Sequence, residues 1–299
     1  MKVGFIGLGH MGGPMCRNII KGGHEVVVHD LSEAAVQACV EIGGVAGGSV
    51  ANTAAGADVV MTSLPMPKDV EAVALGPDGI IANAKAGTIY IDLSTNSPSM
   101  MKKIAGEMAA KDITTLDGPV SGGVVGAEKA TIAIMVGGDK SAFDSCMPIF
   151  ESFGKTIVHT GELGSGCVAK LVNNMIAFVN MTAAAEGLML GVAAGMDPVV
   201  LNEIVRNASG NSMGYRGVAK SALERDFAPA FTVDLAYKDM RLALELADEL
   251  DMPLFLGPQV HSVMRMARSK DQGGENVTAV LKVYEAAMGQ QVGPAGKNS

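Results

Sequence analysis

Lys170 is the only charged residue between Val168 and Ala185, and Asn173 and Asn174 follow it closely. On a helix, residues three and four positions apart share one face, so a cation and two amides would lie together. A lysine removed from water titrates nearer neutrality and can exchange a proton with an alcohol or carbonyl oxygen. The alternative is a lysine whose stem covers apolar surface while its ammonium reaches water. We predict that Lys170 is an acid–base group.

A glycine-rich loop follows the first apolar run of the chain. Its residues are Gly7, Leu8, Gly9, His10, Met11 and Gly12. In a dinucleotide site the first glycine permits the tight turn, the second lets the backbone approach a pyrophosphate, and the third lets helix and strand pack closely. The start of the following helix then stabilises the phosphate charge. Ordinary turns also use glycine, so context must decide between the two interpretations.

Asp30 ends the next apolar run, 18 residues after Gly12. An acid at this place in a dinucleotide fold binds the adenosine ribose hydroxyls and repels a 2′-phosphate. The alternative is that Asp30 caps a helix that begins at 31–33. We predict NAD as the cofactor rather than NADP.

Three further segments follow candidate strands. Leu64 and Pro65 lie in the first, and Thr95 lies in the second; ligands of open α/β sheets bind at such strand ends. Either segment could instead be a plain strand-to-helix loop with Thr95 or Asn96 as the helix cap. The third segment contains Ser121, Gly122 and Gly123, whose amides and hydroxyl could donate to a carboxylate, or which could form only a flexible turn.

The elements that must position these residues divide the chain into an α/β part and an all-α part. Continuous apolar runs, typical of strands buried on both faces of a mostly parallel sheet, lie at 2–7, 25–30, 58–64, 88–94, 113–120, 131–138 and 156–161. Helical patterns between them include 15–23 and 97–111. After Gly166 only helical patterns remain, at 166–193, 197–208, 233–250, 254–269 and 276–288. We expect the boundary at 161–166 and a long, buried helix that carries Lys170 along the wall of a cleft.

Composition excludes several classes of function. The chain has 299 residues, 48% apolar and 18% charged, with a formal net charge of −8, which is typical of a soluble, mildly acidic protein of two domains. It has no Lys/Arg cluster for nucleic acid, and its four cysteines and five histidines have no disulfide or metal-site spacing. The chain starts directly on an apolar strand, so we expect a cytoplasmic protein without a signal peptide. A membrane span over 168–185 would place Lys170 and three asparagines in lipid, so we expect no membrane association.

Five segments in one order closely resemble the β-hydroxyacid dehydrogenase family. They are GFIGLGHMGGPM (4–15), GTIYIDLST (87–95), DGPVSGG (117–123), GCVAKLVNN (166–174) and DLAYKDMRLAL (234–244). The resemblance implies an α/β Rossmann domain that binds NAD at 1–162, and an all-helical domain for substrate binding and oligomerisation at 163–290. It also implies a long helix that joins the domains, and we expect a flexible tail at 291–299. A homodimer or homotetramer is implied.

The resemblance also implies roles for individual residues. Lys170 would be the general acid/base, and Asn174 would orient the substrate beside it. Ser121 with Gly122 and Gly123 would bind the substrate carboxylate. Thr95 would lie by the nicotinamide, and Lys238 would contact both cofactor and substrate.

The implied reaction interconverts a small 3-hydroxy acid and its semialdehyde, of the 2-(hydroxymethyl)glutarate, 3-hydroxyisobutyrate or tartronate semialdehyde type. Our hypothesis is that Asn211 or Arg216 binds the distal group of that substrate. Two alternatives are an imine reductase of similar fold, in which Asp or Tyr commonly replaces the lysine, and a non-catalytic dinucleotide-binding protein. No metal is implied by any of these interpretations.

Overall fold

The computed structural model describes residues 1–293, and they form two compact units. The first is Met1–Lys170, and the second begins at Leu171. Residues 294–299, the greater part of the tail predicted at 291–299, lie outside the described residues.

The first unit is built on one sheet, whose strands are β1 (Lys2–Ile6), β2 (Glu25–His29), β3 (Val45–Ala46), β4 (Val59–Thr62), β5 (Ile89–Asp92), β6 (Thr114–Asp117), β7 (Val120–Ser121), β8 (Ile132–Gly137) and β9 (Gly154–Gly161). The order β3-β2-β1-β4-β5-β6 is parallel throughout, which is the Rossmann order. β8 extends the sheet antiparallel to β6 and β7, and β9 pairs with it in parallel. All seven predicted ranges contain a strand, and the mixed α/β fold class is confirmed.

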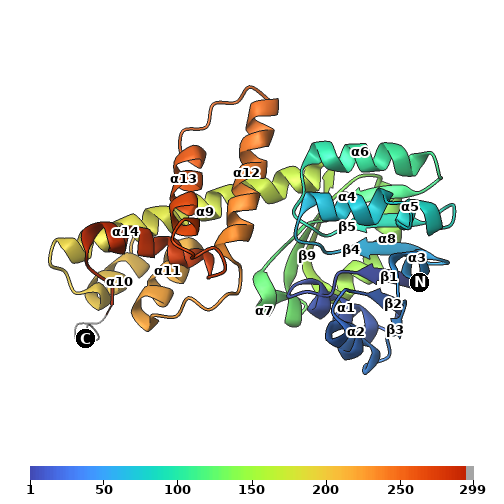
Figure 1. Cartoon of the computed structure of the whole chain (residues 1–299), viewed down its shortest axis with the longest axis horizontal. Helices are drawn as coiled ribbons and strands as arrows, with labels where there is room; N and C mark the ends of the chain where they lie inside the picture. The colour runs from blue at the N-terminus through green and yellow to red at the C-terminus, as the bar shows by residue number, and fades with distance from the viewer. Residues whose placement is uncertain (294–299) are drawn as a thin grey trace. The chain divides into compact units, whose positions relative to one another are not determined.

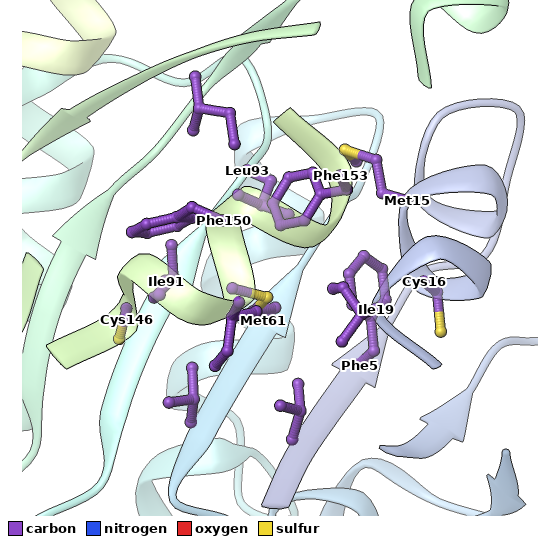
Figure 2. Packing of buried hydrophobic residues seen from close by; sticks show 14 of the residues in the cluster. Phe5, Met15, Cys16, Ile19, Met61, Ile91, Leu93, Cys146, Phe150 and Phe153 are labelled. Atoms are coloured by element: carbon purple, nitrogen blue, oxygen red, sulfur yellow. The ribbon is translucent and has the colours of Figure 1, made fainter. Parts of the chain in front are cut away.

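Helices cover both faces of this sheet. They are α1 (Gly12–Lys21), α2 (Glu33–Val40), α3 (Val50–Ala54), α4 (Pro67–Leu75), α5 (Ile80–Asn83), α6 (Pro98–Ala109), α7 (Gly123–Glu128) and α8 (Lys140–Phe153). Figure 2 shows α1 and α8 packing Met15, Ile19 and Phe150 against Phe5 and Met61 of the central strands. On the opposite face, buried side chains of α4, α5 and α6 pack in a separate cluster. Full burial on both faces explains why these strands read as continuous apolar runs.

The second unit consists of helices joined by loops in its described residues, with one isolated β-bridge between Thr232 and Asn276. Beyond the part of α9 (Ser165–Ala193) that it contains, its helices are α10 (Pro198–Arg206), α11 (Met213–Glu224), α12 (Val233–Glu249), α13 (Gly257–Arg268), the 3-10 helix η1 (Val277–Val280) and α14 (Leu281–Met288). One cluster of buried residues joins α9, α11, α12, α13 and α14, and α12 packs beside α13 (Figure 1). α11 was not predicted from the sequence, and the all-helical class of this unit is confirmed.

α9 is confirmed as one helix of 29 residues, about 43 Å long at 1.5 Å per residue. Its length and composition would also suffice to cross a membrane, the only such helix found in residues 1–293. The expectation that the helix is buried is wrong for much of it, because only 39% of its most apolar window is covered. Val168, Val172 and Ile176, four residues apart, leave an apolar stripe exposed.

Candidate active site

The glycine loop between β1 and α1 has the geometry that a pyrophosphate requires. Gly7 has φ +95°, and its amide donates to the His29 carbonyl oxygen over 2.9 Å. A Cβ on Gly12 would overlap the Gly7 carbonyl oxygen, whereas a Cβ on Gly9 would meet no heavy atom within 4 Å. No side chain caps the start of α1, and its first turn contains no acid. The exposed backbone at Gly9 and the uncapped helix start therefore fit an anionic ligand.

The carboxylate of Asp30, at the end of β2, holds the loop in place. Its Oδ2 accepts the Leu8 amide over 2.6 Å, and its Oδ1 accepts the Ser32 amide over 2.7 Å. Ser32, rather than Asp30, is the N-cap of α2. A carboxylate has about four lone-pair sites, so two hydrogen bonds leave acceptor capacity for the hydroxyls of a ribose. The loop and Asp30, predicted separately, are thus joined by a direct contact.

A buried polar network fixes the strand ends that contain Leu64, Pro65 and Thr95. Asp92, 1% exposed, accepts hydrogen bonds from Thr62 Oγ1 (2.9 Å), the Ser94 amide (3.1 Å) and Asn96 Nδ2 (3.1 Å). The Ser94 hydroxyl in turn accepts the Leu64 amide over 2.9 Å. Burial raises the pKa of Asp92, and the hydrogen bonds from Ser94, Asn96 and Thr62 oppose that shift.

The structure rules out the capping role considered for Thr95 or Asn96, and it shows that Asp92 is part of the candidate site. The N-cap of α6 is Ser97, so neither Thr95 nor Asn96 has the capping role considered from the sequence. Asp92 was not predicted as important, although an acid that ends a buried strand is a signal that could have been used.

Lys170 lies in the second turn of α9, and its Nζ donates to the Val120 carbonyl oxygen over 2.6 Å. Val120 directly precedes Ser121, Gly122 and Gly123, so the ammonium is held at the start of the predicted carboxylate-binding segment. Gly122 has φ +140° and Gly123 has φ +66°, conformations that L side chains rarely adopt. A Cβ on Gly123 would meet no heavy atom within 4 Å, which leaves its backbone accessible.

In the second unit, a carboxylate joins two predicted residues. Asn174 Nδ2 donates to Asp239 Oδ2 over 2.7 Å, and Lys238 Nζ lies 2.9 Å from Asp239 Oδ1. All three side chains are at most 6% exposed. Asn173 Nδ2 donates to Asn174 Oδ1 over 3.0 Å, so the orientation of the Asn174 amide is set from both ends. Asp239 was not among the predicted residues, although a buried acid beside Lys238 is what a buried cation needs.

Asn211 and Arg216 contact each other at the start of α11. Asn211 Oδ1 accepts Arg216 Nε over 3.0 Å, and Asn211 Nδ2 donates to the Arg206 carbonyl oxygen over 2.8 Å. Both polar atoms of the Asn211 amide therefore have protein partners, while the Arg216 side chain remains exposed. Residues 1–293 contain no group of three or more His, Cys, Asp or Glu side chains placed to hold a metal ion.

Two family models cover nearly the whole described chain. The NAD binding domain of 6-phosphogluconate dehydrogenase matches residues 2–161. The model described as the NAD-binding domain of NADP-dependent 3-hydroxyisobutyrate dehydrogenase matches residues 164–284. Both descriptions name a nicotinamide dinucleotide. They do not agree on NAD or NADP, because the second names an NADP-dependent enzyme.

Individual relatives match over almost their full length. The chain is 41% identical to 2-(hydroxymethyl)glutarate dehydrogenase of Eubacterium barkeri, with 98% of this chain and 97% of the relative covered. It is 36% identical to NAD-dependent L-serine dehydrogenase of Pseudomonas aeruginosa, with 97% and 99% covered. The crystal structure of 3-hydroxyisobutyrate dehydrogenase from Salmonella typhimurium superposes with a TM-score of 0.87 at 28% identity, covering 95% of this chain and 99% of that one.

Proposed function

Because this chain is a hydroxy acid dehydrogenase of the β-hydroxyacid dehydrogenase family, we propose that it transfers hydride between NAD and a small 3-hydroxy acid or its semialdehyde. The observation that carries this proposal is the Lys170 ammonium, held 2.6 Å from the Val120 carbonyl oxygen beside the glycine pair. A proton donor and a set of carboxylate-binding amides are the two parts that such a reaction needs besides the cofactor.

The cofactor of the proposal is NAD. When bound, it supplies the hydride acceptor in oxidation and the hydride donor in reduction. Gly9 and the start of α1 would hold the pyrophosphate, and Asp30 would hold the adenosine ribose. The carboxylate of Asp30 disfavours NADP because it would lie near a 2′-phosphate of like charge.

Lys170 is proposed as the general acid/base. In the oxidation direction its neutral amine accepts the hydroxyl proton as hydride leaves the same carbon, and a carbonyl results. In the reduction direction its ammonium returns that proton to the carbonyl oxygen. NAD accepts the hydride and Lys170 accepts the proton, so the reaction needs no further reactant.

Substrate binding is proposed to use the residues predicted from the sequence. Ser121, Gly122 and Gly123 would bind the substrate carboxylate, and Asn174 would orient the substrate one helical turn from Lys170. Lys238, whose ammonium lies 2.9 Å from Asp239 Oδ1, would contact both substrate and cofactor.

The proposal also concerns the distal group of the substrate. The relatives above are named for acids with different distal groups, so the substrate type is proposed as 2-(hydroxymethyl)glutarate, 3-hydroxyisobutyrate or tartronate semialdehyde. Arg216 is the better candidate for the distal group, because both polar atoms of Asn211 already have partners.

Assembly into a homodimer or homotetramer is part of the same proposal. The exposed stripe of Val168, Val172 and Ile176 on α9 supports it, because such a stripe is better covered by a second copy than by water. Light scattering coupled to size exclusion would report the mass. A monomer at micromolar concentration would contradict this part of the proposal.

The test of the reaction is absorbance of reduced nicotinamide with a panel of 3-hydroxy acids, L-serine, the matching semialdehydes and cyclic imines. We expect turnover of hydroxy acids or semialdehydes with NAD and none of imines. Turnover of imines alone would favour the imine reductase alternative, which Lys170 argues against.

A further inference from the structure

Asp117, the last residue of β6, is a buried carboxylate that the proposed reaction leaves without a role. It is 0% exposed, and both of its oxygens point at the start of α9. Oδ1 accepts the Gly164 amide over 2.7 Å, and Oδ2 accepts the Cys167 amide over 2.6 Å. Burial raises the pKa of Asp117, and the two amide hydrogen bonds oppose this because they favour the charged form. The carboxylate thus ties the first turn of α9 to the end of β6.

The chain leaves little room for any other arrangement of this carboxylate. A Cβ on Gly137, in β8, would lie 2.5 Å from Asp117 Oδ1 and 2.8 Å from Ser165 Oγ. A Cβ on Gly166 would lie 2.9 Å from Asp117 Oδ2 and would overlap the Met135 carbonyl oxygen. Two glycines from different elements therefore permit the close approach of α9 to the sheet at this point.

A second contact joins the same two segments. Each of its two residues lies three positions later in the chain than its counterpart in the first contact. Cys167, bound to Asp117, precedes Lys170 by three residues, and Asp117 precedes Val120 by three residues. The Lys170 ammonium donates to the Val120 carbonyl oxygen, so α9 is joined both to the end of β6 and to β7. Rotation or sliding of α9 that broke the Asp117 contacts would also move Lys170 relative to Ser121.

We propose that Asp117 is a positioning residue of the reaction, whose carboxylate fixes the start of α9 so that Lys170 stays beside Ser121, Gly122 and Gly123. The inference rests on the proposed function of Lys170. A displacement of about 1 Å at a reacting group can lower the rate about 10²-fold. Asp117 touches neither substrate nor cofactor in this proposal, so binding of NADH should not depend on it.

The main variant is Asp117→Asn, which keeps the volume but presents an N–H to one of the two amides. We expect kcat to fall about 10²-fold while NADH affinity stays at the wild-type value. Gly137→Ala disturbs the carboxylate from the β8 side with its charge retained, and it should lower kcat in the same way. It also keeps the test available if Asp117→Asn does not fold.

The matched control is Asp139→Ala. Asp139 caps α8 by accepting the Ala142 amide over 2.8 Å, and α8 carries no candidate site residue. Loss of this cap should lower Tm and leave kcat unchanged. An equal loss of kcat in Asp139→Ala would show that lost stability alone is responsible, and would overturn the inference.

A second measurement does not depend on activity. Reductive methylation with formaldehyde and cyanoborohydride, read by peptide mass spectrometry, reports how firmly the Lys170 amine is held. We expect faster methylation of Lys170 in Asp117→Asn than in wild type, with Lys155 of β9 as the internal reference. Wild-type kcat and wild-type methylation in both Asp117→Asn and Gly137→Ala would overturn the inference. Full turnover by Lys170→Ala would instead overturn the proposed function, and the methylation rates would still decide whether Asp117 positions that lysine.

Discussion

Gly9 offers a sharp test of the cofactor loop, because the structure separates its folding role from its binding role. A Cβ built on Gly9 meets no heavy atom within 4 Å, and the residue does not need a positive φ. Gly9→Ala should therefore fold normally. The added methyl would, however, lie where the backbone must approach a pyrophosphate.

The expected magnitude follows from the contact that is lost. A hydrogen bond to a charged group contributes about 1.5–3 kcal/mol, which corresponds to a loss of NADH affinity of about 10- to 150-fold. The free energy of unfolding should change little, or rise by about 0.4–1 kcal/mol because alanine restricts the unfolded chain.

Two other glycines serve as comparisons. A Cβ on Gly106, exposed in α6, also meets nothing within 4 Å, so Gly106→Ala should stabilise the helix by about 1 kcal/mol and leave NADH binding unchanged. A Cβ on Gly12 would overlap the Gly7 carbonyl oxygen, so Gly12→Ala should lose about 1–3 kcal/mol of stability.

The assay is titration of NADH by fluorescence together with thermal unfolding of each variant. Weak NADH binding with an unchanged Tm in Gly9→Ala would support the loop as the pyrophosphate site. Wild-type NADH affinity in Gly9→Ala would refute this reasoning, since no other effect of the methyl is expected.

Three further predictions concern single side chains. Asp30→Ser should weaken NADH binding by about tenfold or more and reduce the preference for NADH over NADPH, measured as the ratio of their Kd values, because a charged acceptor of about 1.5–3 kcal/mol is lost. Burial, together with Arg265, Arg241 and Arg268, lowers the pKa of His261 in the folded protein. The unfolded chain therefore binds a proton at His261 more tightly than the folded protein does. The Tm should therefore fall as pH drops below about 6.5, and His261→Gln should flatten that dependence, whereas an unchanged slope would contradict it. Glu285 is 6% exposed and pairs with Arg225 through both oxygens, so Glu285→Ala should lower the free energy of unfolding by about 3 kcal/mol in urea titrations.

The strands were predictable from the sequence because the central strands are buried on both faces. β1, β4 and β5 are short and largely apolar, which is typical of strands buried on both faces of a sheet. β3 was not predicted, because its two residues are exposed and its strand conformation depends on pairing with β2.

α11 was missed for a different reason. The run from Asn207 to Gly214 is rich in residues typical of turns, and it hid the helix start. The N-cap is Ser212, whose hydroxyl accepts the Tyr215 amide over 2.9 Å. A Cβ on Gly214 would lie 3.0 Å from the Met181 amide nitrogen, so this glycine permits close packing of α11 on α9, which sequence spacing does not reveal.

The candidate site residues could be predicted from sequence motifs. The buried acids that hydrogen-bond to them or to their neighbours were found only in the folded structure. Asp92, Asp117 and Asp239 contact groups that are 30 to 65 positions away in the chain. Each is a buried acid whose long-range partners are set by strand order or helix packing, so those contacts could not be predicted from sequence spacing.

The most direct test of the account is the turnover of Lys170→Ala, measured with NAD and the best hydroxy acid of the panel. We predict that kcat falls by about 10²–10⁴-fold while NADH binding stays at the wild-type value. Full turnover by Lys170→Ala would contradict the account, because the proton would then have another acceptor.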